Sequence, residues 1–340
     1  MSSEPTPAQH QPAFDELLGR IRQTRQAVFA HANTALIDLY WSVGQVISQQ
    51  VRREAWGKGV VAELARYIAR QAPEIKGFSD KNLWRMKQFY EAYEGDTILS
   101  PLVRELPWTH NLTIFSRCQS SEERAYYLRV ATAEKWSKRE LERQINSAQF
   151  ERAALGAKLS PLLRELHPAA GQVFKDSYVL EFLGLPTQHS EADLQRALVG
   201  QMKTFILELG SDFIFVGEEY RLQVGNQDFR LDLLFFHRGL AALVAVELKI
   251  GRFEPAHLGQ LSFYLEALDR DVKKPHENPS IGVLLCRDHD QEVVEYALSR
   301  HLSPALIAQY QLQLPDKKLL QARLHELLRG ELPANNDNHE

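Results

Sequence analysis

Apolar residues recur at spacings of three and four along the first 150 residues, which is the pattern of helices that bury one face. Ser79 is a suitable N-cap, and Ser137 with Glu140 forms an S-x-x-E capping box that opens a helix running to about residue 152. The other predicted helices cover residues 14–54, 60–71, 77–93, 107–117 and 120–133. This half of the chain is therefore predicted to be all-helical.

The pattern changes in the second half. A helix over 190–209 ends at Gly210, a natural stop for a helix. Runs rich in β-branched and aromatic residues then predict strands, separated by two more helices. The strands cover 213–224, 229–236, 241–249, 280–286 and 305–314, and the helices 255–268 and 291–300. This order predicts an α/β domain with a mixed sheet flanked by helices.

These patterns divide the chain into five parts. A polar, proline-bearing leader is expected to be disordered, and Pro161, Pro168 and Gly171 mark a linker between the two domains. The parts are leader 1–12, helical domain 13–152, linker 153–175, α/β domain 176–325 and polar tail 326–340.

Composition narrows the class of protein. Of 340 residues, 44% are apolar and 25% charged, which excludes a wholly disordered chain and a collagen-like fibre. Two distant cysteines, Cys118 and Cys286, argue against a disulfide framework or a zinc site and fit a reducing cytoplasm. No uninterrupted apolar stretch is long enough to predict a transmembrane helix, so we expect no membrane partner.

Net charge is −4 overall, but it is unevenly divided. Residues 1–150 carry a net charge of +3 and residues 151–340 one of −7. The division fits separate tasks for the two halves, although a difference of this size also arises from ordinary variation in composition.

Asp232, Glu247 and Lys249 form the candidate chemical site. Glu247 and Lys249 are two apart on the most apolar strand, so both side chains lie on one face of the sheet, where ionisable groups are costly. A hairpin that pairs residue 236 with residue 241 makes Glu247 a diagonal neighbour of Asp232. Two carboxylates at that separation can share a divalent metal, and the metal and lysine suit phosphodiester hydrolysis. The alternative is an ordinary Glu–Lys ion pair with Asp232 at a strand end.

The arrangement D-(14 residues)-E-L-K after a helix and a hairpin resembles the PD-(D/E)XK nuclease motif, and Gln260 with Tyr264 matches a Q-x-x-x-Y element that some such nucleases carry. The string from Phe215 to Asp269, with DSYVLEFLGLP and GFSDKNLWRMKQFY, resembles the YhcG-like family of bacterial PD-(D/E)XK proteins over residues 15–325. The resemblance implies a restriction-endonuclease-like core, with Asp232 and Glu247 binding Mg²⁺ or Mn²⁺ and Lys249 acting in catalysis. Gln260 and Tyr264 would support them, unless they are ordinary surface residues.

One position departs from the superfamily pattern. Many of these nucleases place a glutamate on the first core helix, where Gln195 stands in this chain. Glu208, later on that helix, is another acid, but it lies close to the helix end. The number of metals is therefore left open.

The resemblance also implies a DNA-binding role for the helical half. Residues 57–93 fit a helix-turn-helix, whose second helix would present Lys81, Asn82, Arg85 and Gln88 to the major groove. The alternative is a helical bundle whose polar face meets only water.

Taken together, these features predict a metal-dependent DNA endonuclease, and the resemblance implies a role in bacterial defence, restriction or recombination. It would act in the cytoplasm on duplex or branched DNA, as a homodimer or with a protein partner of a defence system. The alternative is a non-catalytic DNA-binding or adaptor protein with a degenerate nuclease fold. Metal binding distinguishes the two, because only the nuclease should be stabilised by Mg²⁺ or Mn²⁺ through Asp232.

Overall fold

A computed structural model describes residues 11–53, 56–96 and 99–330. The chain forms two compact units, which divide between Glu142 and Arg143. Most of the leader expected at 1–12 lies outside the described residues, and helix α1 already begins at Gln11. Of the polar tail expected at 326–340, residues 326–330 belong to α15 (Lys317–Gly330), and the remainder lies outside the described residues.

The first unit is helical, as predicted. Its helices are α1 (Gln11–Arg52), α2 (Lys58–Gln71), α3 (Asp80–Tyr93), α4 (Leu99–Leu102), α5 (Trp108–Arg117) and α6 (Ser121–Ala133). The Ser79 hydroxyl accepts a hydrogen bond from the Asn82 amide and so caps α3. Gly44 lets α1 approach α3 closely, because a Cβ there would lie 2.2 Å from the Met86 carbonyl oxygen. Tyr40, Ile47, Leu83 and Met86 are buried between these helices.

Two helices predicted as continuous are broken. The helix that opens at Ser137 is α7 (Lys138–Asn146), and α8 (Gln149–Leu155) follows after Ala148, whose φ of 53° interrupts the helical path. The helix predicted over 190–209 is likewise two helices, α11 (Glu191–Gly200) and α12 (Met202–Leu209), separated at Gln201. Periodicity alone missed both breaks because the apolar spacing continues across them.

The linker predicted at 153–175 is wrong. These residues hold β1 (Lys158–Leu159), α9 (Pro161–Leu166) and α10 (Ala170–Val173). Leu163 and Phe174 are buried in the core of the second unit, and β1 pairs with the last strand. The prolines do not mark a flexible segment here, since Pro161 occupies the first turn of α9, where proline is tolerated.

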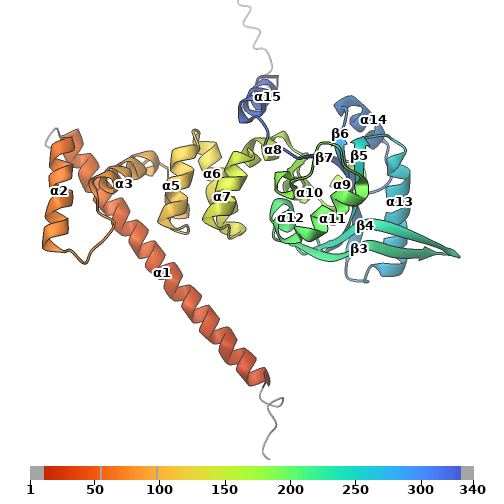
Figure 1. The fold of residues 1–340 in the computed structure, drawn as a ribbon, viewed down its shortest axis with the longest axis horizontal. Coiled ribbons are helices and arrows are strands. Elements are labelled where there is room, and N and C mark those ends of the chain that lie inside the picture. Colours follow the sequence, from red (N-terminus) through yellow and green to blue (C-terminus); the bar gives the residue numbers. More distant parts are fainter. Residues whose placement is uncertain (1–10, 54–55, 97–98, 331–340) are drawn as a thin grey trace, which may run out of the picture. The chain divides into compact units, whose positions relative to one another are not determined.

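The second unit contains a mixed sheet flanked by helices, as predicted (Figure 1), but the sheet has seven strands, because β1 and β2 join the five that were predicted. The strand order is β1-β7-β6-β5-β4-β3, and β2 also pairs with β7. The remaining strands are β2 (Ser177–Val179), β3 (Phe213–Val224), β4 (Gln227–His237), β5 (Ala242–Arg252), β6 (Asn278–Asp288) and β7 (Ala305–Gln311). Strands β5, β6 and β7 run parallel, so their carboxyl ends lie at one edge of the sheet.

Helices cover both faces of this sheet. Helices α11 and α12 pack on one face through Leu194, Leu198 and Phe205. Helix α13 (His257–Ala267) and helix α14 (Gln291–Ser299) cover the other face. Gly282 on β6 allows α13 to approach, because a Cβ there would lie 2.8 Å from the Leu261 side chain. Among the described residues, none of the helices is apolar over a length that could cross a membrane.

The hairpin between β4 and β5 has a different register from the predicted one. Phe236 pairs with Leu243 rather than with residue 241, because the loop spans residues 238–241 instead of 237–240. The ring nitrogen Nδ1 of His237 accepts a hydrogen bond from the Leu240 amide, and Ala241 has a φ of 48°. The shift is two residues, an even number, so each side chain stays on the predicted face of the sheet.

Candidate active site

Asp232 and Glu247 lie at the end of the β4–β5 ladder. They are the next residues along their strands after the Leu233–Val246 pair. An Asp232 carboxylate oxygen accepts a hydrogen bond of 2.7 Å from the Leu248 amide, so the side chain crosses to the neighbouring strand. The Glu247 side chain is only 4% exposed. The fold therefore brings both predicted carboxylates together in a buried place.

Lys249 contacts Glu247 and a further acid, Glu191. Its Nζ lies 3.2 Å from Oε1 of Glu247 and 3.6 Å from Oε2 of Glu191. Glu191 is the first residue of α11, and its other carboxylate oxygen accepts a hydrogen bond of 3.4 Å from the Ile250 amide. One lysine thus contacts an acid from the sheet and an acid from the first core helix.

Glu191 is the residue that sequence reasoning missed. Gln195, which stood at the expected position, donates a hydrogen bond from its amide to the Asp232 carbonyl oxygen instead. Glu191 lies one helical turn before Gln195, immediately after the N-cap Ser190. An acid in the first turn of a helix is ordinarily explained by capping and the helix dipole, so Glu191 was not predicted to belong to the site. The signal available was its position one turn from Gln195 on the same helix.

Gln260 and Tyr264 come from α13, on the sheet face that Glu247 and Lys249 share. The Gln260 amide donates a hydrogen bond of 2.7 Å to the Tyr264 hydroxyl, and Tyr264 is buried. Burial raises the pKa of Tyr264, and the carboxylates of Glu247 and Asp232 add to that rise. The two α13 residues therefore belong to the electrostatic surroundings of the site.

Burial governs the protonation of this site. It raises the pKa of Glu247 to about 7, with a further rise from Asp232 that Lys249 opposes. Burial also raises the pKa of Asp232, although the Leu248 amide and Lys249 act in the other direction. For Lys249, burial lowers the pKa, but Glu247, Glu191 and Asp232 outweigh it and the net change is upward. A site with one lysine and three acids carries excess negative potential that a cation would neutralise.

The residues present fit a divalent cation. Oε2 of Glu247 is buried and has no hydrogen-bond partner, which is costly for a carboxylate unless a ligand supplies one. Carboxylate oxygens are the ligands that Mg²⁺ and Mn²⁺ prefer. Within 11–53, 56–96 and 99–330, no three acidic, histidine or cysteine side chains are grouped closely enough to hold a metal by themselves. Asp232 and Glu247 would therefore share the ion with water or phosphate oxygens.

Glu208, the other acid considered as a metal ligand, belongs to a different cluster, and that prediction is wrong. Its carboxylate lies 2.8 Å from Nη1 of Arg152 and 2.8 Å from Nη2 of Arg143, and the Val179 amide also donates to it. Lys175 lies 3.7 Å away. These groups occupy both oxygens, so Glu208 has none left for a metal.

The predicted nucleic-acid face of α3 is only partly free. Lys81, Arg85 and Gln88 are exposed. Asn82 is half-buried: its amide donates to the Gly77 carbonyl, and its side-chain oxygen accepts a hydrogen bond of 3.2 Å from Trp108. Asn82 therefore holds the turn before α3, and the three exposed residues are the ones available to a ligand.

Comparison with known proteins connects these features. Residues 171–325 match the family described as "YhcG PDDEXK nuclease domain", and residues 16–152 match "DUF1016 N-terminal domain". A protein of Escherichia coli K12 named "Putative nuclease YhcG" is 32% identical to this chain over 94% of each sequence. The chain belongs to the YhcG family. The resemblance inferred from the sequence is thereby confirmed, as is the nuclease-type fold.

Membership of the YhcG family places Asp232, Glu247 and Lys249 inside a nuclease domain of PDDEXK type. A solved repair endonuclease from Pyrococcus abyssi also resembles the chain in part, at 15% identity and a TM-score of 0.26. That similarity covers 38% of this chain and 49% of the other, and at this score it has no bearing on function.

Proposed function

We propose that this protein is a metal-dependent DNA endonuclease that hydrolyses phosphodiester bonds at the Asp232–Glu247–Lys249 site. The observation that carries the proposal is the buried Oε2 of Glu247, which has no partner beside a second carboxylate and a lysine. Membership of a family with a PDDEXK nuclease domain supports the same reading.

In this proposal Asp232 and Glu247 hold Mg²⁺ or Mn²⁺. When bound, the ion supplies Lewis-acid chemistry and lowers the pKa of bound water. Lys249 orients the attacking water and stabilises negative charge that develops on the phosphate. Glu191 acts as a positioning residue, because its carboxylate lies 3.6 Å from the Lys249 ammonium. Gln260 and Tyr264 border the site and would contact the phosphate flanking the cut.

The helical unit would bind the DNA. Lys81, Arg85 and Gln88 are exposed on one face of α3, and the first 150 residues have a net positive charge. Since the acidic second half has little intrinsic attraction for phosphate, most of the affinity would come from the helical unit. We place the enzyme in the cytoplasm, in defence, restriction or recombination, as a homodimer or with a defence-system partner.

A cleavage assay tests this proposal. Wild type would be offered labelled linear, branched and single-stranded DNA with Mg²⁺ or Mn²⁺, beside Lys249→Ala and a matched surface control, Lys274→Ala. We expect cutting by wild type and by the control, and its loss in Lys249→Ala and in EDTA. DNA binding that is unaffected by metal, with no cutting of any substrate, would instead support a non-catalytic adaptor.

A further inference from the structure

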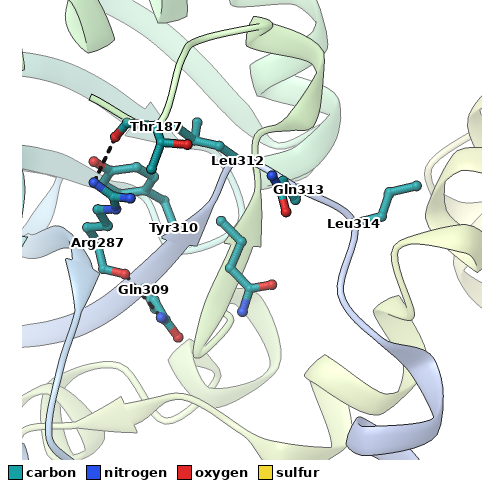
Figure 2. A pocket seen from close by; sticks show the side chains of 8 residues that line it. Thr187, Arg287, Gln309, Tyr310, Leu312, Gln313 and Leu314 are labelled. Atoms are coloured by element: carbon teal, nitrogen blue, oxygen red, sulfur yellow. Dashed lines mark hydrogen bonds between the residues drawn. The ribbon is translucent and has the colours of Figure 1, made fainter. Parts of the chain in front are cut away.

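A pocket opens at the carboxyl ends of β6 and β7 (Figure 2). Its volume is about 400 Å³. Arg287 near the end of β6 and Tyr310 on β7 line one part of it, and Gln313 and Leu314 follow from the segment after β7. Thr187 contributes from the loop that precedes α11. The pocket is thus built by three segments far apart in the sequence.

The exposed side chain of Arg287 is oriented in this pocket by a hydrogen bond. Its Nη1 donates a hydrogen bond of 2.8 Å to the Thr187 carbonyl oxygen, drawn as a dashed line in Figure 2. The Gln309 amide in turn donates to the Arg287 carbonyl oxygen at 3.0 Å. A guanidinium carries five N–H donors, so one bond to Thr187 orients the group and leaves donors for a ligand. An arginine oriented in this way can bind a phosphate through two parallel hydrogen bonds, that is, in a bidentate manner.

The remaining lining suits a nucleobase. Gln311 and Gln313 bring side-chain amides, whose paired donor and acceptor can match the edge of a base. Leu312 and Leu314 add apolar surface for its flat faces. None of the eight lining residues is acidic, so nothing in the lining repels a phosphate. Phosphate and base contacts occur together only in a ligand such as a nucleotide.

The sheet fixes how far this pocket lies from the catalytic lysine. Lys249 pairs with Cys286 on β6, and Cys286 pairs with Gln309 on β7. Two strand spacings, about 10 Å, separate the backbones of Lys249 and Gln309. Tyr310 belongs to the core on the α11 and α12 face, whereas Lys249 lies on the α13 face, so a strand that reaches both must cross the end of the sheet. A backbone separation of this size is short enough for one nucleic-acid strand to reach both places.

We infer that this pocket receives an unpaired nucleotide of the substrate strand, close to the phosphate that is cut. The inference rests on the proposed nuclease function and narrows its substrate to nucleic acid with a single-stranded portion. A pocket of this volume admits one nucleotide but not a duplex, and a base can enter it only after leaving the stack. Arg287 and Gln313 are then specificity-determining residues.

Binding measurements test the inference without cleavage. The full chain carrying Lys249→Ala would be titrated with labelled duplexes that are blunt or carry a five-nucleotide 5′ or 3′ extension. We expect Arg287→Ala to weaken binding of one of the two extended duplexes, the 5′ or the 3′ one, about tenfold, which is the usual effect of losing a hydrogen bond to a charged group. The affinity for the blunt duplex should not change. Arg300→Ala, an exposed arginine outside the pocket, is the matched control.

A second variant distinguishes a loss of nucleotide binding from a loss of folding in Arg287→Ala. Gln313 is exposed after the end of β7, so Gln313→Trp would fill the pocket without disturbing the sheet, and it should give the same selective loss. Photo-crosslinking of 4-thiothymidine in the extension should label the peptide that holds residues 309–314. Equal loss on blunt and extended duplexes, or a crosslink elsewhere, overturns the inference. Cutting by wild type in the same buffers reports separately on the nuclease proposal.

Discussion

Glu208 and Glu247 are both buried in the second unit, yet their surroundings are opposite. Glu208 is 0% exposed, and Arg143, Arg152 and Lys175 surround it. Glu247 is 3% exposed and lies beside Asp232, and among the described residues Lys249 is the one cation in contact with it. Burial would raise the pKa of Glu208, but its three cationic partners hold that pKa well below the usual range, whereas the pKa of Glu247 rises to about 7.

The difference separates a charge that stabilises the fold from a charge that is available for function. The cost of burying Glu208 is offset by groups of the chain itself, so the cluster is electrostatically complete. The cost of burying Glu247 is not offset, which is typical of sites where a ligand supplies the missing charge. Burial alone therefore does not distinguish the two glutamates, whereas the number of opposing charges around each one does.

The largest expected effect is on stability. Arg152→Met should lower the free energy of unfolding of the second unit by about 3–5 kcal/mol, because it leaves a buried carboxylate short of its partners. Lys249→Met should cost far less, since Glu247 can bind a proton when its lysine is removed. Denaturant unfolding of both variants at pH 7 provides the measurement. Equal losses would contradict the contrast between the two glutamates.

The next effect is a dependence of stability on pH. Because the pKa of Glu247 is raised from 4.5 to about 7, the folded state holds its proton over a range where the unfolded state has lost it. The contribution of Glu247 to stability is therefore fully present below pH 4.5 and falls by about 3 kcal/mol as the pH rises to 7 and above. Glu247→Gln should remove this fall in metal-free buffer. Parallel stability curves for variant and wild type over pH 5–8 would argue against it.

A tenfold effect is expected on metal affinity. At pH 6 a carboxyl with a pKa of about 7 is about one-tenth ionised, so Mn²⁺ should bind about tenfold more weakly at pH 6 than at pH 8. Calorimetric titration at the two pH values measures the ratio and the proton released. Asp232→Asn should abolish binding, and Asp269→Asn, on the helix after α13, is the matched control. Equal affinity at both pH values would show that the ion does not contact Glu247.

The smallest effect concerns Glu191. Its side chain is 45% exposed, so Glu191→Gln should change the free energy of unfolding by no more than about 0.5 kcal/mol. It should nevertheless reduce kcat, because the Lys249 ammonium loses its ion pair with Glu191. Glu191→Asp keeps the charge and should restore part of that loss. A change in stability as large as that of Arg152→Met would make Glu191 a structural acid like Glu208.

Sequence reasoning reached the main site through short-range geometry. Side chains two apart on a strand share a face, and helix residues four apart share a face, so Glu247 with Lys249 and Gln260 with Tyr264 could be grouped in advance. The register of the β4–β5 hairpin could not be predicted, because it depends on the hydrogen bond from the Leu240 amide to His237. The even shift kept Asp232 on the correct face.

Long-range pairing explains the remaining errors. Glu208 was considered a metal ligand because its partners Arg143 and Arg152 are more than 50 residues away in the sequence. Glu191 was missed because its contact with Lys249 joins a helix start to a strand 58 residues later, for which the sequence holds no periodic signal. When the partners of an acid come from distant elements, its role can be assigned only from the three-dimensional structure.

The Glu208 cluster also determines where this chain can be divided. Arg143 and Arg152 lie on α7 and α8, within the stretch that matches the DUF1016 N-terminal domain, while Glu208 lies within the nuclease-domain match. A fragment cut at residue 171 would keep the carboxylate but lose both arginines. The smallest autonomous nuclease therefore begins before Arg143, and any exchange of domains within the family has to carry these two helices with the nuclease.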